Sequence, residues 1–189
     1  MRGRCMIRII AGEWKGRKLK TPPGRFVRPT SDRVREALFN ILGDVTGFKV
    51  LDLFAGTGAL GIEALSRGAD SAVFADRDSL ACRIVSGNLE IVGGGSRAAI
   101  WRLSAAATVE KASKEGMRFD LIFVDPPYDS EWTDEIRKNP HFQNILAADG
   151  LAVFEFDVKN PPTADPNWRL VDERHYGGTG LTFQRPQGL

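Results

Sequence analysis

The stretch that decides the fold is LDLFAGTGALGIEAL, residues 51–65. The apolar residues up to Phe54 predict the end of a buried strand, and the residues after Gly58 predict a helix. Between the two, Gly56, Gly58 and Gly61 have the spacing G-x-G-x-x-G. Glycines with this spacing between a strand and a helix are typical of cofactor sites, because they let the backbone come close to a ligand.

The alternation of strand and helix continues along the rest of the chain. Apolar runs predict strands at residues 49–54, 71–76, 98–103, 119–125, 150–157, about 168–176 and 181–185. Helices are predicted between them at residues 58–68, 78–91, 104–114 and over most of 130–146, with Pro140 limiting the last of these. Nearly continuous apolar strands that alternate with helices indicate a parallel sheet covered on both faces. The sequence therefore predicts an α/β fold, a doubly wound Rossmann-like sheet that is mostly parallel and ends in a C-terminal antiparallel hairpin.

Two smaller elements are predicted upstream of this pattern. RPTSDRVREALFNILGD, residues 28–44, has one apolar stripe at helical spacing and predicts an amphipathic helix. MIRIIAGEWKGRKLKTPPG, residues 6–24, mixes strand-forming residues with glycine turns and predicts a small β structure. We therefore expect a basic N-terminal β-hairpin extension at residues 1–27 and one main domain at residues 28–189.

The net charge of +2 conceals an asymmetry along the chain. Residues 1–35 hold 11 Lys or Arg against two acidic residues, a net +9, and the other 154 residues hold 15 against 22, a net −7. A basic segment that is predicted to fold favours a nucleic acid partner over a solvated tail. For Trp14, packing is favoured over stacking on a base, and for Arg33 and Arg35 the alternative is a solvated helix face. The candidate RNA contacts are Arg8, Trp14, Lys15, Arg17, Lys18, Arg28, Thr30, Arg33 and Arg35.

Several classes of protein are disfavoured by the composition. No apolar run approaches the roughly 20 residues of a membrane helix, and the N-terminus lacks the apolar core of a signal peptide. Cys5 and Cys82 are too few for a disulfide framework, and His141 and His175 have no metal-like spacing. We therefore expect a cytoplasmic protein without membrane or metal.

Two carboxylates accompany the glycine loop and indicate which cofactor it holds. Asp76 comes 20 residues after Gly56, at the end of the next predicted strand, where an acidic residue binds ribose hydroxyls. Asp52 comes four residues before Gly56, where its charge would offset the roughly 0.3–1 kcal/mol that favours a pyrophosphate at a helix N-terminus. S-adenosylmethionine carries positive charge and no phosphate, so it is favoured over NAD. The predicted cofactor-binding residues are Asp52, Phe54, Ala55, Gly56, Thr57, Gly58, Asp76, Arg77, Ser104 and Ala105.

A second unusual stretch is IFVDPPYDS, residues 122–130, in which an apolar strand ends on a carboxylate, two prolines and an aromatic ring. Ligands of doubly wound sheets bind between the first and fourth strands, so Asp125 is expected across the cleft from Asp52. The Asp125 carboxylate and the Pro126 carbonyl could accept the two N–H bonds of an exocyclic base amine and free its lone pair. The prolines fix the backbone, and the aromatic ring could stack on the base. The predicted catalytic residues are Asp125, Pro126, Pro127 and Tyr128.

These motifs resemble those of a known family. DLFAGTGALGIEALSRGA (52–69) and FVDPPY (123–128) are similar to class I S-adenosylmethionine methyltransferases that act on exocyclic amines. With RIIAGEWKGRKL (8–19) and RPTSDRVREALFNIL (28–42), the chain resembles the RsmD family, as far as the closing YGGTGLTF (176–183).

The resemblance implies a seven-stranded sheet and a monomeric enzyme that methylates N2 of a guanine in 16S ribosomal RNA, within an assembled or partly assembled small subunit. It assigns Asp52, Gly56, Gly58 and Asp76 to the cofactor and residues 125–128 to the target amine and base. The chain departs from many related enzymes at Ser104-Ala105, where they place an acidic residue near the adenine. Some relatives have phenylalanine at the position of Tyr128.

Other functions remain open at this point. The same chemistry would serve a DNA or RNA methyltransferase acting on adenine N6 or cytosine N4, although the chain has no spare length for a target-recognition region. The glycine spacing alone would also suit an NAD-dependent oxidoreductase. A non-catalytic RNA-binding module on a methyltransferase fold is the third alternative, which the intact motifs disfavour.

Overall fold

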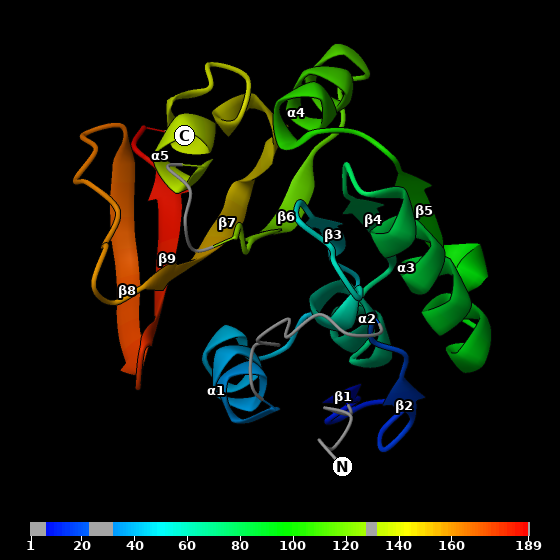
Figure 1. The fold of residues 1–189 in the computed structure, drawn as a ribbon. Helices are drawn as coiled ribbons and strands as arrows, with labels where there is room; N and C mark the ends of the chain where they lie inside the picture. Colours follow the sequence, from blue (N-terminus) through cyan, green and yellow to red (C-terminus); the bar gives the residue numbers. More distant parts are fainter. Residues whose placement is uncertain (1–6, 23–31, 128–131, 189) are drawn as a thin grey trace.

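The computed structural model describes residues 7–22, 32–127 and 132–188. At its centre is a seven-stranded sheet in the order β5-β4-β3-β6-β7-β9-β8 (Figure 1). The pairs from β5 to β7 are parallel, whereas β9 pairs antiparallel with both β7 and β8. The predicted mostly parallel sheet with an antiparallel C-terminal hairpin is therefore confirmed. The strands are β3 (Lys49–Asp52), β4 (Ser71–Ala75), β5 (Ala98–Trp101), β6 (Phe119–Val124), β7 (Leu146–Asp157), β8 (Trp168–Tyr176) and β9 (Thr179–Pro186).

Side chains that alternate along the strands build a hydrophobic core on each face of the sheet. On the first face, Val50 and Phe123 pack with α1, α2 and α3. On the second face, Leu51 and Ile122 pack with α4 and α5. Figure 1 shows α4 and α5 above the sheet, and α1 and α2 below it. The helices are α1 (Asp32–Leu42), α2 (Ala59–Ser66), α3 (Ser79–Val92), α4 (Ala105–Lys114) and α5 (Trp132–Lys138), with single 3-10 turns at η1 (Gly95–Arg97) and η2 (Gln143–Ile145).

The prediction of helix over most of 130–146 is wrong in its second half. Helix α5 ends at Lys138, and Pro140 two residues later has no N–H with which to continue the helical bonds. The chain then turns so that Phe142 is buried in the second core. Strand β7 begins at Leu146, four residues before the predicted start at residue 150. The need to bury these apolar side chains outweighs the local preference for helix.

The predicted N-terminal β structure is confirmed, although its paired strands β1 (Ile7–Arg8) and β2 (Lys18–Leu19) are only two residues long. Ile9 and Trp14 of this hairpin are buried in the core of the first face, together with residues of α2 and α3. The hairpin is therefore packed onto the body of the protein. The predicted boundary between residues 27 and 28 lies outside the described residues.

Helix α2 holds the hairpin by hydrogen bonds as well as by packing. The buried Glu63 carboxylate accepts the backbone N–H groups of Ile10 and Ala11, at 2.8 and 3.0 Å. The Ser66 hydroxyl accepts the backbone N–H of Trp14 at 3.0 Å. A Cβ atom at Gly12 would lie 1.8 Å from the Ser66 carbonyl oxygen, so only glycine allows this close approach. None of the helices within the described ranges is long and apolar enough to cross a membrane.

Candidate active site

The candidate site lies where β3 and β6 are neighbours although they are far apart in the sequence. Asp52, the last residue of β3, is paired with Phe123 of β6 in parallel register, and the Leu53 N–H donates to the Phe123 carbonyl at 3.0 Å. Asp125 follows two residues after Phe123. The predicted adjacency of the two strand ends is therefore confirmed. Between these strands the order of connections reverses, and open α/β sheets bind ligands at such points.

Glycine is needed at the three positions of the loop after β3 for different structural reasons. Gly56 has a φ of 54°, and an added Cβ would approach nothing closer than the Phe54 carbonyl oxygen, at 3.9 Å. A Cβ at Gly58, with a φ of 77°, would instead lie 3.2 Å from Val85, and one at Gly61 would lie 2.4 Å from the Phe74 ring. Gly56 therefore leaves room for a ligand, whereas Gly58 and Gly61 let α2 pack against the sheet. The sequence suggested that Gly58 lets the backbone come close to a cofactor. The internal packing gives a different physical reason for glycine at this position.

The Asp76 carboxylate lies against the glycine loop, directly after β4. One oxygen accepts the Gly56 N–H at 3.0 Å and the other accepts the Asp78 N–H at 2.8 Å. The side chain is half-buried, so its position is fixed while part of it still faces solvent. Each carboxylate oxygen has lone pairs left for further donors, such as sugar hydroxyl groups.

The Asp52 carboxyl group is buried behind the loop, with 2% of the residue exposed. It accepts the Gly61 N–H at 3.1 Å and so holds the first turn of α2. Burial raises the pKa of Asp52 to about 7, the Gly61 N–H opposes this rise, and the negative charge of Asp76 adds to it. The structure thus shows Asp52 as a support of the loop, and its contact with a cofactor stays a prediction.

The other predicted cofactor residues come from the same edge of the sheet. Ala55 and Thr57 are buried in the loop, Phe54 is half-buried, and Arg77 after β4 is exposed. Ser104 is exposed at the start of α4, where its hydroxyl accepts the Ala107 N–H at 3.2 Å and caps the helix. Ala105 is buried in the second core. The loops after β3, β4 and β5 therefore bring all these residues to one end of the sheet.

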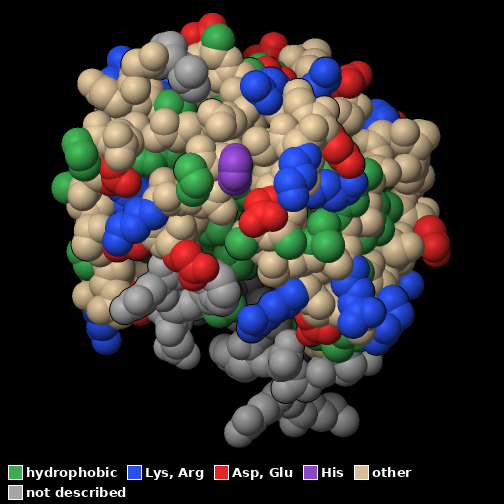
Figure 2. Space-filling view, turned by 90° about the horizontal axis from the view of Figure 1, so that it is seen from above, with side chains coloured by type: hydrophobic (Ala, Val, Ile, Leu, Met, Phe, Trp, Pro, Cys, Tyr) green, Lys and Arg blue, Asp and Glu red, His purple; other side chains and the backbone are tan. Residues whose placement is uncertain are grey.

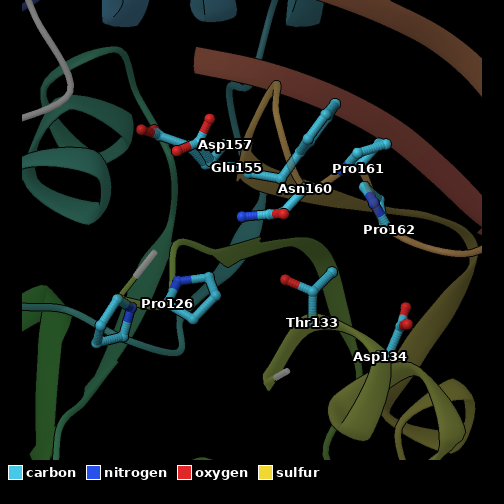
Figure 3. Close-up of a pocket in the computed structure, with 10 residues that line it drawn as sticks. Pro126, Thr133, Asp134, Glu155, Asp157, Asn160, Pro161 and Pro162 are labelled. Atoms are coloured by element: carbon cyan, nitrogen blue, oxygen red, sulfur yellow. The ribbon is translucent and has the colours of Figure 1, made fainter. Parts of the chain in front are cut away.

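A pocket of about 170 Å³ lies on the other side of the Asp125–Pro127 turn, towards β7 (Figure 3). Asp125 is half-buried, Pro126 is buried and Pro127 is exposed, and Tyr128 lies outside the described residues. The turn therefore separates the glycine loop from the pocket. Residues of four elements line it: Pro126 and Pro127 after β6, Thr133 and Asp134 on α5, Glu155 and Asp157 on β7, and the loop at 160–162.

The sequence predictions missed the β7 and α5 walls of this pocket. One signal was present: the strand ends EFD, so Glu155 and Asp157 interrupt an apolar run at the same edge as Asp52 and Asp125. Nothing in the sequence places the loop at 160–162 beside α5, because that contact depends on how the chain returns from β7.

The predicted RNA contacts separate into exposed and buried residues. Lys15, Arg17 and Lys18 of the hairpin are exposed, as are Arg8 and Arg33. The Arg8 guanidinium pairs with Asp32 at 3.2 Å, and that of Arg17 donates to the Ile91 carbonyl at 2.9 Å. Arg28 and Thr30 lie outside the described residues.

Two of these residues lie in the interior, which confirms packing as the favoured role of Trp14 and removes both from the candidate RNA contacts. Trp14 is 3% exposed and packs in the first core beneath the Arg97 guanidinium, 4.9 Å from the ring centre, so it cannot stack on a base. Arg35 is 1% exposed and donates to the Arg8 carbonyl and to Asp32, at 2.6 and 3.0 Å. Its burial excludes both the RNA contact and the alternative of a solvated face.

A buried side chain connects the hairpin to the glycine loop. The amide oxygen of Asn88 on α3 accepts the Lys20 N–H at 2.7 Å. Its amide nitrogen donates to the carbonyl oxygens of Lys20 and Thr57, at 3.1 and 2.9 Å. The basic hairpin and the candidate cofactor loop are thus fixed to one another by a single residue.

The sheet order, the glycine loop after β3 and the Asp-Pro-Pro turn after β6 together define the class of Rossmann-like methyltransferases. Among solved structures, a putative methyltransferase yhhF from Escherichia coli superimposes with a TM-score of 0.78. It is 34% identical, and the match covers 97% of this chain and 99% of that one.

Sequence comparison identifies the family. The family model described as "conserved hypothetical protein 95" matches residues 7–185. A putative rRNA methyltransferase YlbH of Bacillus subtilis is 37% identical over 96% of this chain and all of its own length. The ribosomal RNA small subunit methyltransferase D of Escherichia coli K12 is 37% identical over 93% of this chain and 87% of its own. The chain belongs to this family, which confirms the resemblance to the RsmD family.

Proposed function

We propose that this chain transfers a methyl group from S-adenosylmethionine to the N2 amine of a guanine in 16S ribosomal RNA. The observation that carries the proposal is the position of the Asp125–Pro127 turn. It follows β6 directly, next to the glycine loop of β3 on one side and to an open pocket on the other. A turn rich in hydrogen-bond acceptors, placed between a cofactor loop and a pocket, is what methylation of a base amine requires.

The residues of the glycine loop fit S-adenosylmethionine. Gly56 leaves open space for a ligand, and the Asp76 carboxylate beside it can accept the ribose hydroxyl groups. The Asp76 carboxylate lies against the loop, which suits a cationic cofactor better than a pyrophosphate. The cofactor supplies a methyl group on a positively charged sulfur, which makes that methyl group open to attack by an amine.

The Asp125–Pro127 turn is proposed to activate the amine. The lone pair of a base amine is delocalised into the ring, so the nitrogen is a poor nucleophile. The Asp125 carboxylate and the Pro126 carbonyl accept its two N–H bonds, draw the nitrogen towards tetrahedral geometry and free the lone pair. With the cofactor bound, the freed lone pair would take up its methyl group as the bond to sulfur breaks, leaving S-adenosylhomocysteine, and the positively charged nitrogen would then release one proton to water. Tyr128 is proposed to stack on the base.

The exposed bases of the hairpin are proposed to hold the RNA. Arg8, Lys15, Arg17 and Lys18 are exposed on the hairpin, and Arg33 is exposed on α1. Such side chains bind backbone phosphates without reading sequence. Arg28 and Thr30 are proposed to contribute as well. The names of the two relatives support a ribosomal RNA substrate. We propose further that the enzyme acts as a monomer in the cytoplasm, on an assembled or partly assembled small subunit.

The test is a methyl-transfer assay with identification of the product nucleoside. The protein is incubated with labelled S-adenosylmethionine and small ribosomal subunits from a strain that lacks it, and the RNA is then digested to nucleosides. We expect label in N2-methylguanosine. Label in N6-methyladenosine or N4-methylcytidine would support the alternative targets. Binding of NADH without binding of S-adenosylhomocysteine would reject the proposed cofactor.

A further inference from the structure

The pocket beside the Asp125–Pro127 turn has a carboxylate in its β7 wall. Glu155 lies near the end of β7, lines the pocket and is 6% exposed (Figure 3). The pocket is also lined by Pro126, whose carbonyl is one of the proposed amine acceptors. Whatever enters the pocket next to this turn therefore meets Glu155 as well.

The register of the sheet places Glu155 beside Asp125. Phe123 pairs with Val153, and both side chains lie in the core of the first face. Val124 ends β6 opposite Phe154, so Asp125 follows the strand directly at the level of Glu155. Alternation along β7 places Glu155 on the same face as Val153. On the other side, Glu155 pairs with Leu181 of β9, whose side chain also lies in the first core. One carboxyl group, that of Asp125, thus follows β6 directly, and the other, that of Glu155, lies two residues before the end of the neighbouring β7.

A row of three acceptors would match only one of the candidate bases. The Watson–Crick edge of guanine presents N1–H beside the two N–H bonds of its 2-amine, a continuous row of donors. Adenine and cytosine present an amine beside a ring nitrogen that carries a lone pair instead. A carboxylate that accepts N1–H of guanine would face that lone pair and repel it. Sites built around a hydrogen bond discriminate strongly against analogues that lack the matching group.

We propose that Glu155 selects guanine by accepting its N1–H, while Asp125 and Pro126 hold the 2-amine. This inference rests on the proposed function and adds to it the residue that sets base specificity. Glu155 does not take part in the transfer itself.

The test compares guanine with 2-aminopurine at the methylated position, which is first located by mapping the label to one nucleotide of the intact 16S rRNA. 2-Aminopurine keeps the 2-amine but has a lone pair at N1 in place of N1–H. Small subunits are assembled on 16S rRNA ligated to carry either base, and kcat/KM is measured for each. For the wild type we expect a preference for guanine on the order of 100-fold. Equal rates on the two bases would overturn the proposal, whatever any variant does.

Glu155→Gln supplies the second arm of the test. The glutamine amide can donate to the N1 lone pair of 2-aminopurine, so the preference for guanine should fall by roughly tenfold or more. Binding of S-adenosylhomocysteine should stay unchanged, which shows that the variant is folded. Glu135→Gln, which removes an exposed carboxylate of α5 outside the pocket, should keep the wild-type preference. A Glu155→Gln enzyme that binds S-adenosylhomocysteine and retains the full preference would refute the role of Glu155, while N2-methylation of guanine by the wild type would still uphold the proposed function.

Discussion

Asp52 and Asp76 are two acidic residues at neighbouring strand ends, and their surroundings give them different properties. Asp76 is half-buried and accepts two backbone N–H bonds. Asp52 is almost completely buried and accepts one, so burial dominates and raises its pKa to about 7. Asp52 therefore holds its proton in the folded protein at pH values where an exposed aspartate is ionised.

The raised pKa of Asp52 predicts a particular dependence of stability on pH. Between pH 4 and 7 the folded state binds this proton and the unfolded state does not, so the free energy of unfolding falls as the pH rises. A shift of this size corresponds to roughly 4 kcal/mol, lost as the pH rises through that window. Asp52→Asn cannot ionise and its amide oxygen can still accept the Gly61 N–H. We expect the variant to be more stable than the wild type at pH 8, measured by urea unfolding.

Comparing the wild type with Asp52→Asn at two pH values separates the effect of Asp52 on stability from that of the other titrating groups. At pH 4.5 the wild type and Asp52→Asn should differ little in the free energy of unfolding, and the gap should open towards pH 8. Parallel profiles for the two proteins would show that the Asp52 carboxyl group titrates normally.

At the scale of single residues, the sequence shows which types of side chain a segment contains but not which of them are buried. Arg35 and Trp14 are a cation and an aromatic ring in a basic segment, which is the usual composition of an RNA-binding surface. They are buried because Asp32, the Arg8 carbonyl and Arg97 offer partners that only the fold brings together. Glu63, which holds the hairpin, carried no signal in the sequence, since its partners are backbone groups more than 50 residues away.

At the scale of elements, the glycine loop shows that one motif serves two purposes. Gly56 faces open space at a positive φ, and Gly61 faces the ring of Phe74. The motif therefore predicts a cofactor loop and a tightly packed helix at once, but it does not say which glycine serves which purpose.

Alanine substitutions separate these purposes. Gly56→Ala places a methyl group in the open space and should weaken binding of S-adenosylhomocysteine by roughly tenfold. Its left-handed backbone adds about 1–2 kcal/mol of strain. Gly61→Ala drives a methyl group into the Phe74 ring and should lower the free energy of unfolding by about 1–3 kcal/mol.

Titration calorimetry and urea unfolding measure the two effects on the same samples. Gly61→Ala is the matched control for binding, because its added methyl group lies inside the protein. If Gly61→Ala weakened ligand binding as much as Gly56→Ala, the division of roles between the two glycines would be wrong.

Helices and strands were predictable wherever the alternation of apolar strands and helices was uninterrupted. The strand–helix alternation from β3 to β6 has apolar strands and glycine-marked ends, and the structure follows it. Pro140 signalled the end of α5, but the turn after it was not predictable, because the apolar residues there fit a helix as well as the turn that buries Phe142 and Ile145. Only the position of the second core decides between the two.

At the scale of the whole molecule, positive charge is concentrated on the hairpin. The face over α4 and α5, seen in Figure 2, carries acidic and basic side chains interspersed. The hairpin exposes Lys15 and Lys18 on a segment that is fixed to the glycine loop through Asn88. RNA bound there would be held at a constant distance from the site of transfer.

The hairpin charges should determine the salt dependence of RNA binding. The slope of log K against log salt is negative. Replacing both Lys15 and Lys18 by alanine should make it shallower by roughly 1.5, at about 0.7–0.9 per phosphate contact. Arg17 is left in place because its guanidinium holds the Ile91 carbonyl. Replacing Lys114 and Arg118, two exposed bases near α4, is the control and should leave the slope unchanged. Equal slopes for both double variants would place the RNA elsewhere.

The position of the site was the part of the molecule that the sequence predicted best. In a doubly wound sheet the strand order reverses, here between β3 and β6. The glycine loop follows one of these strands and the Asp-Pro-Pro turn follows the other. The pocket was not predictable, because its walls come from β7, α5 and a loop whose meeting depends on the chain beyond the repeated pattern.

The central claim is that Asp125 acts on the target amine and not on the cofactor. The most direct measurement pairs single-turnover methyl transfer with the dissociation constant of S-adenosylhomocysteine for the wild type and for Asp125→Ala. We predict a fall in transfer of about 100- to 1000-fold or more, with the dissociation constant nearly unchanged. Transfer close to the wild-type rate, or a loss of affinity as large as the loss of rate, would contradict the account.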